Sequence, residues 1–450
     1  MKLIIVIAGL GGFLYGVDFG VIAAAEPYLM ALGIYSGTRV SLVVGAVMLG
    51  GLISSLTAGV LCDWLGRKKM IVAASAMFLL AIPVVCLSLD SFPILLTGRI
   101  LQGMSAGYMA VVMPMYITET LPPAIRGRGT GVFQFFLGLG LVVAAGAGCL
   151  VATYYGASDA AGLDAVGKTA AWRANFWWTM APVAVLFAGS LWLPESPVWL
   201  ARRAGGTRSC ASEMGETRSC ASGRAGARPS PTLLQRRYVI PFLLACLVLT
   251  FNKTTGMSSF TSYLVSILHQ AGFDGIFANW GQLAVKLTNM LVTLVAAVLI
   301  DRKGRTWLLK VGTGGMTLGL AAIGCVFLAI ERFGVQANNF TGLLTLFAFF
   351  FMQVFYALGP GICVWLVLSE LMPSRIRANG MAIALFLNQL AACGLASTFR
   401  PWVEAWGWSS MFFFFAVNGV LYFVTSCFIP ETKGKSLEEL ETLFEKKTKS

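Results

Sequence analysis

Hydrophobic residues along this chain come in long runs of about 20 or more, separated by short polar stretches. A helix needs about 20 mostly apolar residues to cross about 30 Å of hydrocarbon. The pattern therefore predicts an all-α membrane protein with twelve transmembrane helices. The expected spans are 3–25, 38–61, 70–90, 92–118, 128–153, 173–193, 238–268, 279–300, 306–330, 340–369, 377–399 and 408–429.

The composition supports this assignment. Of the 450 residues, 57% are hydrophobic and 12% are charged, and the mean hydropathy is +0.77, values that exclude a soluble core with a charged shell. The opening "MKLIIVIAGL" has some features of a signal peptide. Asp18 interrupts that apolar run and eleven further spans follow, so we expect it to be the first span.

Basic residues gather in alternate loops, and most of the 33 Lys and Arg lie there or at the two ends. By the positive-inside rule these loops and both termini are cytoplasmic. The net charge of +13 then reflects topology and contact with anionic membrane lipids, and no nucleic acid partner is expected. The expected location is the cell membrane, the inner membrane in a bacterium.

Three polar motifs occur twice, in the same order and roughly 240 residues apart, which indicates an internal repeat. "DWLGRKK" at 63–69 matches "DRKGRT" at 301–306, and "PESP" from Pro194 matches "PET" from Pro430. Between these two motifs, Glu119 precedes Arg126 in the first half, and Glu370 precedes Arg375 and Arg377 in the second. The repeat predicts two pseudo-symmetric six-helix halves with the substrate path between them. The expected boundaries are 1–200, a flexible cytoplasmic linker at 201–236, 237–432, and a cytoplasmic tail at 433–450.

Each repeated cluster places acids at one helix end near guanidinium groups at another, where arginine forks pair with carboxylates. We expect these residues to form a gating network that latches the cytoplasmic ends of the halves in one state and releases them in the other. The predicted members are Asp63, Gly66, Arg67, Glu119, Arg126, Glu195, Asp301, Gly304, Arg305, Glu370, Arg375, Arg377 and Glu431.

Several stretches resemble the sugar porter family of the major facilitator superfamily: "GRILQGMSAG" (98–107), "PMYITE" (114–119), "WRANFWW" (172–178), "PESPVWL" (194–200) and "PETKGKSLEEL" (430–440), with the two D-x-x-G-R motifs. The resemblance implies an alternating-access carrier with a central site, usually for monosaccharides. The linker departs from the family pattern, because it is rich in Gly and Ser and carries "TRSCAS" twice.

Asp18 lies inside the first span, where an ionised acid costs about 2.5–3.5 kcal/mol on insertion scales and normally has a partner and a role. Arg99, with Gln102 on the same helical face, is the expected partner. The resemblance to proton-coupled sugar porters implies that protonation frees Asp18 from Arg99 during symport, with the proton as coupling ion and no cofactor. The alternative is a permanent structural pair in a facilitative uniporter for a sugar or polyol.

The resemblance also implies a set of substrate contacts, although their residue types differ from the family pattern. The family's Gln in span five falls on Leu141, so an ordinary hexose would leave hydrogen bonds unmade. The expected substrate-binding residues are Asn252, Lys253, Ser258, Asn289, Trp365, Asn388 and Gln389.

Two lysines within the spans, Lys253 and Lys286, add positive charge near this region and would suit a carboxylate or phosphate on the substrate. The alternatives are that Lys286 extends to the outer surface and that Lys253 pairs with Asp18 or Glu26. The sequence therefore leaves open whether the carrier takes a neutral sugar or a sugar acid.

Other classes of protein fit less well. An enzyme would need a nucleophile with a base, and a metal site would need clustered ligands, and neither spacing occurs. A transporter-like membrane sensor remains a further alternative, although the linker is short for an output segment. We expect a monomeric carrier, not an enzyme, whose partners are a small-molecule substrate, protons and membrane lipids.

Overall fold

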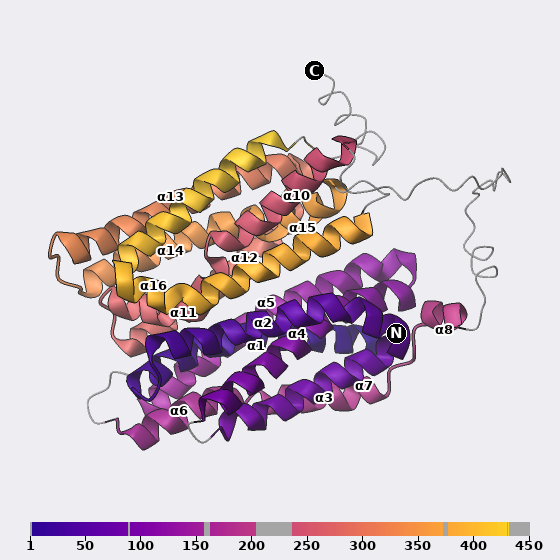
Figure 1. Cartoon of the computed structure of the whole chain (residues 1–450), viewed down its shortest axis with the longest axis horizontal. Coiled ribbons are helices and arrows are strands. Elements are labelled where there is room, and N and C mark those ends of the chain that lie inside the picture. Colours follow the sequence, from indigo (N-terminus) through magenta and orange to yellow (C-terminus); the bar gives the residue numbers. More distant parts are fainter. Residues whose placement is uncertain are drawn as a thin grey trace.

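The computed structural model describes residues 2–88, 91–156, 163–203, 236–371, 377–429 and 431. Its elements are helices that form two bundles lying side by side (Figure 1), one from the first part of the chain and one from the last. Apart from residues 201–203 and 236, the predicted linker lies outside the described residues, as does the predicted tail.

The first bundle holds the predicted spans one to six. Its helices are α1 (Lys2–Ala31), α2 (Gly37–Leu65), α3 (Arg67–Cys86), α4 (Phe92–Thr120), α5 (Pro123–Tyr155), α6 (Ala165–Trp177), α7 (Met180–Leu191) and the short α8 (Pro197–Arg203). The sixth span was expected as one helix from residue 173. In the structure it begins earlier, at Ala165, and breaks between Trp177 and Met180 into α6 and α7.

The second bundle holds α10 (Arg236–Thr254), α11 (Met257–Gln270), α12 (Gly275–Lys303), α13 (Arg305–Arg332), α14 (Asn339–Leu358), α15 (Pro360–Leu371) and α16 (Arg377–Phe428). Two spans of this bundle are broken. Gly256, with φ of 82°, separates α10 from α11, and Gly359–Pro360 separates α14 from α15. Proline lacks the N–H that would continue the helical ladder.

The described part of the chain contains 10 helical stretches long and apolar enough to cross a membrane. One of them, Ile383–Phe428, has 46 residues and contains two spans joined through the non-helical Gly407. The broken pair α10 and α11 supplies the seventh span. The all-α fold with the predicted spans is therefore confirmed, and the protein is an integral membrane protein.

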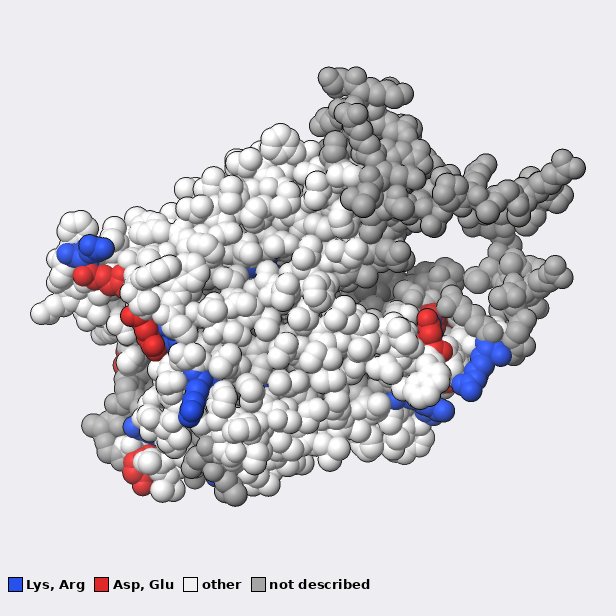
Figure 2. Space-filling view, viewed as in Figure 1, with Lys and Arg blue, Asp and Glu red and all other residues white. Residues whose placement is uncertain are grey.

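The two bundles meet along three helix pairs: α2 with α16, α5 with α12, and α1 with α11. In the first pair, Gly37 lies near Glu404 and Gly51 near Gln389, and both glycines are in the half of α2 on the predicted outer side. In the view of Figure 2, charged side chains lie near two opposite ends of the molecule, and an uncharged band lies between them. Such a band suits the hydrocarbon layer.

Candidate functional site

Asp18 and Arg99 lie together in the interior of the first bundle. The Arg99 Nη1 donates to Asp18 Oδ1 at 3.5 Å, and both side chains are buried. Arg99 also donates to Gln102 Oε1 at 2.7 Å and lies over the ring of Phe176. Because charge-assisted bonds are usually near 2.8 Å, Gln102 holds Arg99 more closely than Asp18 does. The expected pair is present and loosely formed.

The sequence of α1 explains why Asp18 faces α4. Gly12 and Gly16 let α1 lie directly against α5, since a Cβ on either would come within 2.1 Å of a backbone oxygen of α5. Asp18, two residues after Gly16, points away from that contact because side chains two apart on a helix diverge. Its second carboxylate oxygen has no hydrogen bond among the described residues, so the acid retains an available position for a proton.

Two of the expected substrate residues form hydrogen bonds between α10 and other helices of the second bundle. The side-chain amide of Asn252, at the end of α10, donates to the carbonyl of Pro360 at 3.4 Å. The amide of Asn388, on α16, donates to the carbonyl of Leu249 at 2.6 Å. Both amides therefore connect α10 to its neighbours.

Other expected contacts lie on surrounding helices. Asn289 on α12 accepts from Gln353 of α14 at 2.8 Å, and Ser258 is buried at the start of α11. Gln389 lies close to Gly51 of the other bundle. The side chain of Trp365 lies outside the described residues. Sequence reasoning missed Gln353, although a polar residue inside an apolar span is a detectable signal.

Lys286 does not extend to the outer surface, and Lys253 does not pair with Asp18 or Glu26, which were the two alternatives for these lysines. Lys286 is only 4% exposed and donates to the Thr261 hydroxyl at 3.2 Å, so it does not extend to the outer surface. Lys253 is half-buried in the last turn of α10. It does not pair with Asp18 or Glu26, because each acid pairs with an arginine instead.

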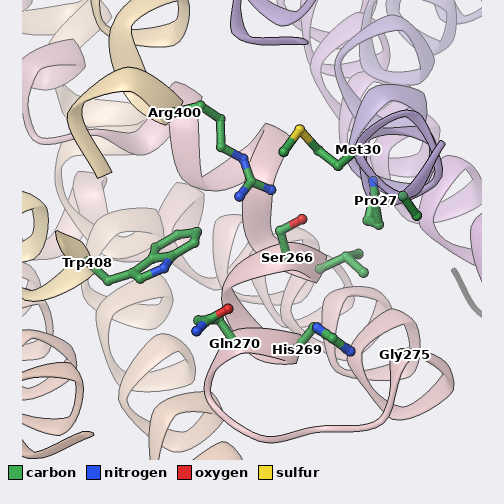
Figure 3. A pocket seen from close by; sticks show the side chains of 10 residues that line it. Pro27, Met30, Ser266, His269, Gln270, Gly275, Arg400 and Trp408 are labelled. Carbon is green, nitrogen blue, oxygen red and sulfur yellow. The ribbon is translucent and has the colours of Figure 1, made fainter. Parts of the chain in front are cut away.

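A second buried ion pair joins the bundles on the predicted outer side. The carboxylate of Glu26, fully buried on α1, accepts from Arg400 of α16, with Nε at 3.0 Å. The Ser266 hydroxyl of α11 also donates to Glu26. Arg400 and Ser266 line a cavity of about 350 Å³ that also contacts Trp408 and His269 (Figure 3). Glu26 was considered in the sequence only as a partner of Lys253.

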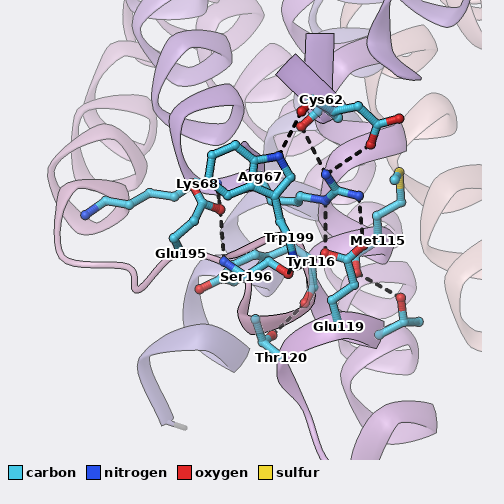
Figure 4. A network of polar contacts seen from close by, with 12 residues as sticks. Cys62, Arg67, Lys68, Met115, Tyr116, Glu119, Thr120, Glu195, Ser196 and Trp199 are labelled. Carbon is cyan, nitrogen blue, oxygen red and sulfur yellow. Dashed lines mark hydrogen bonds and ion pairs between the residues drawn. The ribbon is translucent and has the colours of Figure 1, made fainter. Parts of the chain in front are cut away.

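The expected network near the other end is formed within the first bundle (Figure 4). Arg67 begins α3 and is 1% exposed, and it pairs with Glu119 at 2.9 Å and Asp63 at 3.2 Å. Glu195 accepts from the backbone N–H of Lys68 at 2.9 Å. These bonds connect α2, α3, α4 and the segment before α8.

The second bundle repeats one part of this arrangement. Glu431 accepts from the backbone N–H groups of Arg305 and Thr306 at 3.1 Å each, as Glu195 does with Lys68. Each described bond stays inside one bundle, so the predicted latch between the halves is not formed in the described part of this structure. The side chains of Arg126, Asp301, Glu370, Arg375 and Arg377 lie outside the described residues.

Comparison with known proteins identifies this architecture. A family model described as "Sugar (and other) transporter" matches residues 4–444. The chain belongs to this sugar porter family. The arabinose-proton symporter of Bacillus subtilis is 31% identical, with 97% of this chain and 93% of the relative covered. The D-xylose-proton symporter-like 2 of Arabidopsis thaliana is 30% identical, with coverage of 96% and 88%.

Solved structures show the same fold. A crystal structure of a D-xylose-proton symporter superposes with a TM-score of 0.79 at 21% identity, covering 97% of this chain and 99% of that one. The inward-open xylose transporter XylE from E. coli gives 0.77 at 24% identity, with coverage of 98% and 99%. This sugar porter therefore has the fold of the major facilitator superfamily, and its named relatives are transporters rather than enzymes.

Proposed function

We propose that this sugar porter is a secondary active transporter that couples inward movement of protons to uptake of a monosaccharide or sugar derivative. It works by alternating access, in a cell membrane and with both termini in the cytoplasm. The observation that carries the proposal is the buried pair of Asp18 and Arg99, in which the N···O distance is 3.5 Å.

The geometry of the pair suits a reversible proton site. Gln102 and Phe176 hold the guanidinium independently of Asp18, so protonation of the acid does not leave Arg99 without partners. Once neutral, Asp18 loses most of its attraction to Arg99, and α1 can shift relative to α4. The names of the relatives, which are sugar-proton symporters, support the same coupling.

The arrangement of contacts between the bundles supports alternating access. The described pairings of Glu26 with Arg400 and of Tyr263 with Ser41 at 3.1 Å join the bundles on the predicted outer side. On the opposite side, the described bonds of Arg67 and of Glu431 connect residues of the same bundle. We therefore infer that this structure is closed on the predicted outer side, where the described bonds join the bundles.

A facilitative uniporter is the second candidate, since an intact Asp18–Arg99 pair also suits a purely structural role. Purified protein in proteoliposomes separates the two. With an alkaline interior, wild-type protein should accumulate substrate above the external concentration, tested with labelled xylose, arabinose and hexuronates. Asp18→Asn should abolish this accumulation and retain exchange of substrate under counterflow.

Asp274→Asn makes the same acid-to-amide change at an exposed position before α12 and should behave as wild type. Accumulation by Asp18→Asn equal to that of wild type would disprove the proton role of Asp18. Wild-type protein that equilibrates its substrate but never accumulates it would establish the uniporter.

A further inference from the structure

Three polar side chains follow one face of α12 inside the membrane-spanning region. Gln282, Lys286 and Asn289 are separated by four and three residues, the spacing that places side chains on one side of a helix. Gln282 is 0% exposed and Lys286 is 4% exposed. We call these three residues the α12 polar stripe.

The stripe adjoins the contact between the two bundles. Leu283 and Met290 of α12 face α5, since Cβ atoms at Gly146 and Gly138 would lie 4.0 and 3.3 Å from them. Lys286 follows Leu283 by three residues and precedes Met290 by four, so it shares their face. Around α12, Lys286 therefore lies between the residues that contact α5 and the amides Gln282 and Asn289. The substrate path of a carrier with two bundles runs between the bundles, next to this face.

The hydrogen bonds of the stripe are incomplete. Lys286 has the Thr261 hydroxyl as its neutral partner, and Asn289 accepts from Gln353. Neither the amide nitrogen nor the amide oxygen of Gln282 has a hydrogen-bond partner among the described residues. Buried polar groups in proteins are nearly always satisfied, so these groups point to a ligand.

The charges of the described membrane interior leave Lys286 without a counter-ion. The two buried acids, Asp18 and Glu26, are each held by an arginine, and no carboxylate of a described side chain forms an ion pair with Lys286. Lys253 adds further positive charge before the Gly256 break, where the carbonyl groups at the end of α10 partly compensate it. Lys286 lies in mid-helix and has no such compensation.

We propose that the α12 polar stripe binds an anionic monosaccharide, whose carboxylate or phosphate pairs with Lys286 while Gln282 hydrogen-bonds a sugar hydroxyl. The proposal rests on the proposed carrier function and names its substrate class. A neutral sugar would leave the ammonium group uncompensated, whereas an anionic one supplies the missing charge, and each amide can both donate to and accept from hydroxyls.

Equilibrium binding to the purified full chain tests the substrate class directly. Glucuronate, galacturonate and glucose 6-phosphate are compared with glucose, galactose, xylose and arabinose at low ionic strength. At least one acid should bind about tenfold or more tightly than its neutral counterpart, because a charge-assisted hydrogen bond replaces an unpaired charge. Comparing the two uronates with glucose 6-phosphate shows whether the site accepts a carboxylate or a phosphate.

Variants assign the effect to Lys286. Lys286→Gln should weaken binding of the acid about 10- to 100-fold, and Lys286→Arg should retain most of it. Lys310→Gln makes the same change on α13, which packs against α14, α15 and α16 of its own bundle, and should leave binding unchanged. Without ligand, Lys286→Gln should melt no lower than wild type, since it removes an uncompensated buried charge.

Equal or tighter binding of the neutral sugars, or no binding of any acid by wild-type protein, would overturn the proposal whether or not a variant folds. Acid binding that Lys286→Gln leaves intact would also overturn the assignment to the stripe. Different results would contradict the substrate class and the proton coupling. A proton-driven carrier of neutral sugars contradicts only the substrate class, whereas sugar acids exchanged without response to a proton gradient contradict only the coupling.

Discussion

Glu26 of α1 and Arg400 of α16, which are 374 residues apart in the sequence, form a buried ion pair between the two bundles. The pair is reinforced by Ser266, and the backbone N–H of Arg400 donates to Ser41 of α2 at 3.0 Å. Opening the protein toward the predicted outer side requires these bonds to break together. The pair therefore stabilises the state that is closed on the outer side relative to the outward-open state.

Glu26→Gln should shift the population toward outward-open molecules, because the variant removes the charge that holds Arg400. Breaking one side of a buried pair typically costs about 3–5 kcal/mol. Hydrogen–deuterium exchange should accelerate in the outer end of α1 and around residue 400 of α16. Asp274→Asn changes an exposed acid before α12 and should alter exchange little. Unchanged exchange in Glu26→Gln would show that the pair does not control opening.

Gln102→Leu should make uptake require a more acidic medium. Without its 2.7 Å bond to Gln102, Arg99 can approach Asp18 more closely and stabilise the ionised carboxylate. Protonation then needs a higher proton concentration, and the pH of half-maximal uptake should fall by about one unit if the gain is near 1.4 kcal/mol.

The measurement is gradient-driven uptake across a series of external pH values. Gln134→Leu, at an exposed position of α5, is the matched control and should keep the wild-type profile. A shift of the Gln102→Leu profile to higher pH would contradict this role for Gln102.

Gly12→Ala should destabilise the first bundle. A methyl group there would lie 2.1 Å from the carbonyl oxygen of Phe133 in α5, so the two helices would have to separate. Overpacking of this kind costs about 1–3 kcal/mol. Gly59→Ala places the same methyl where nothing lies within 4 Å and should leave the melting temperature equal or slightly higher. Equal melting temperatures of the two variants would show that α1 and α5 leave room for a methyl group at residue 12.

Gly66→Ala and Gly304→Ala should have matching effects in the two bundles. Both glycines have positive φ, 98° and 93°, and Cβ atoms there would lie 2.5 and 2.8 Å from the carboxylates of Glu195 and Glu431. Each variant should lower the melting temperature through strain of about 1–2 kcal/mol and through displacement of the acid. Gly33→Ala, with φ of 68° and open space, tests a positive φ without a neighbouring acid and should be milder. Equal losses in all three would exclude a role for the acids.

Much of the architecture could be predicted from local sequence. The apolar runs predicted the spans, because a helix that crosses a membrane must satisfy its backbone internally over a fixed length. The breaks at Gly256 and at Pro360 also have local causes, because glycine adopts a positive φ readily and proline lacks the N–H of the helical ladder. The pairing of Asp18 with Arg99 was also predicted, since an acid inside an apolar span needs a partner and the family resemblance named one.

The long-range contacts could not be predicted in this way. Glu26 and Arg400 appear in the sequence as two separate charges near span ends, and their pairing depends on how the two bundles lie against each other. The partner of Asn289 is likewise set by the rotation of α14 about its own axis. In a membrane, lipid-facing and core-facing positions are both apolar, so the pattern along a helix indicates little about which face meets which neighbour.

The sequence by itself therefore predicted a membrane protein of two repeated halves with an acid inside a span, because span length, charge and repeated motifs are local properties. The expectation of a carrier came from the resemblance to sugar porters. Only the tertiary structure decided which charges are compensated and which are not. That outcome depends on distances between residues far apart in the chain, and it left Lys286 as a buried cation without a carboxylate among the described side chains.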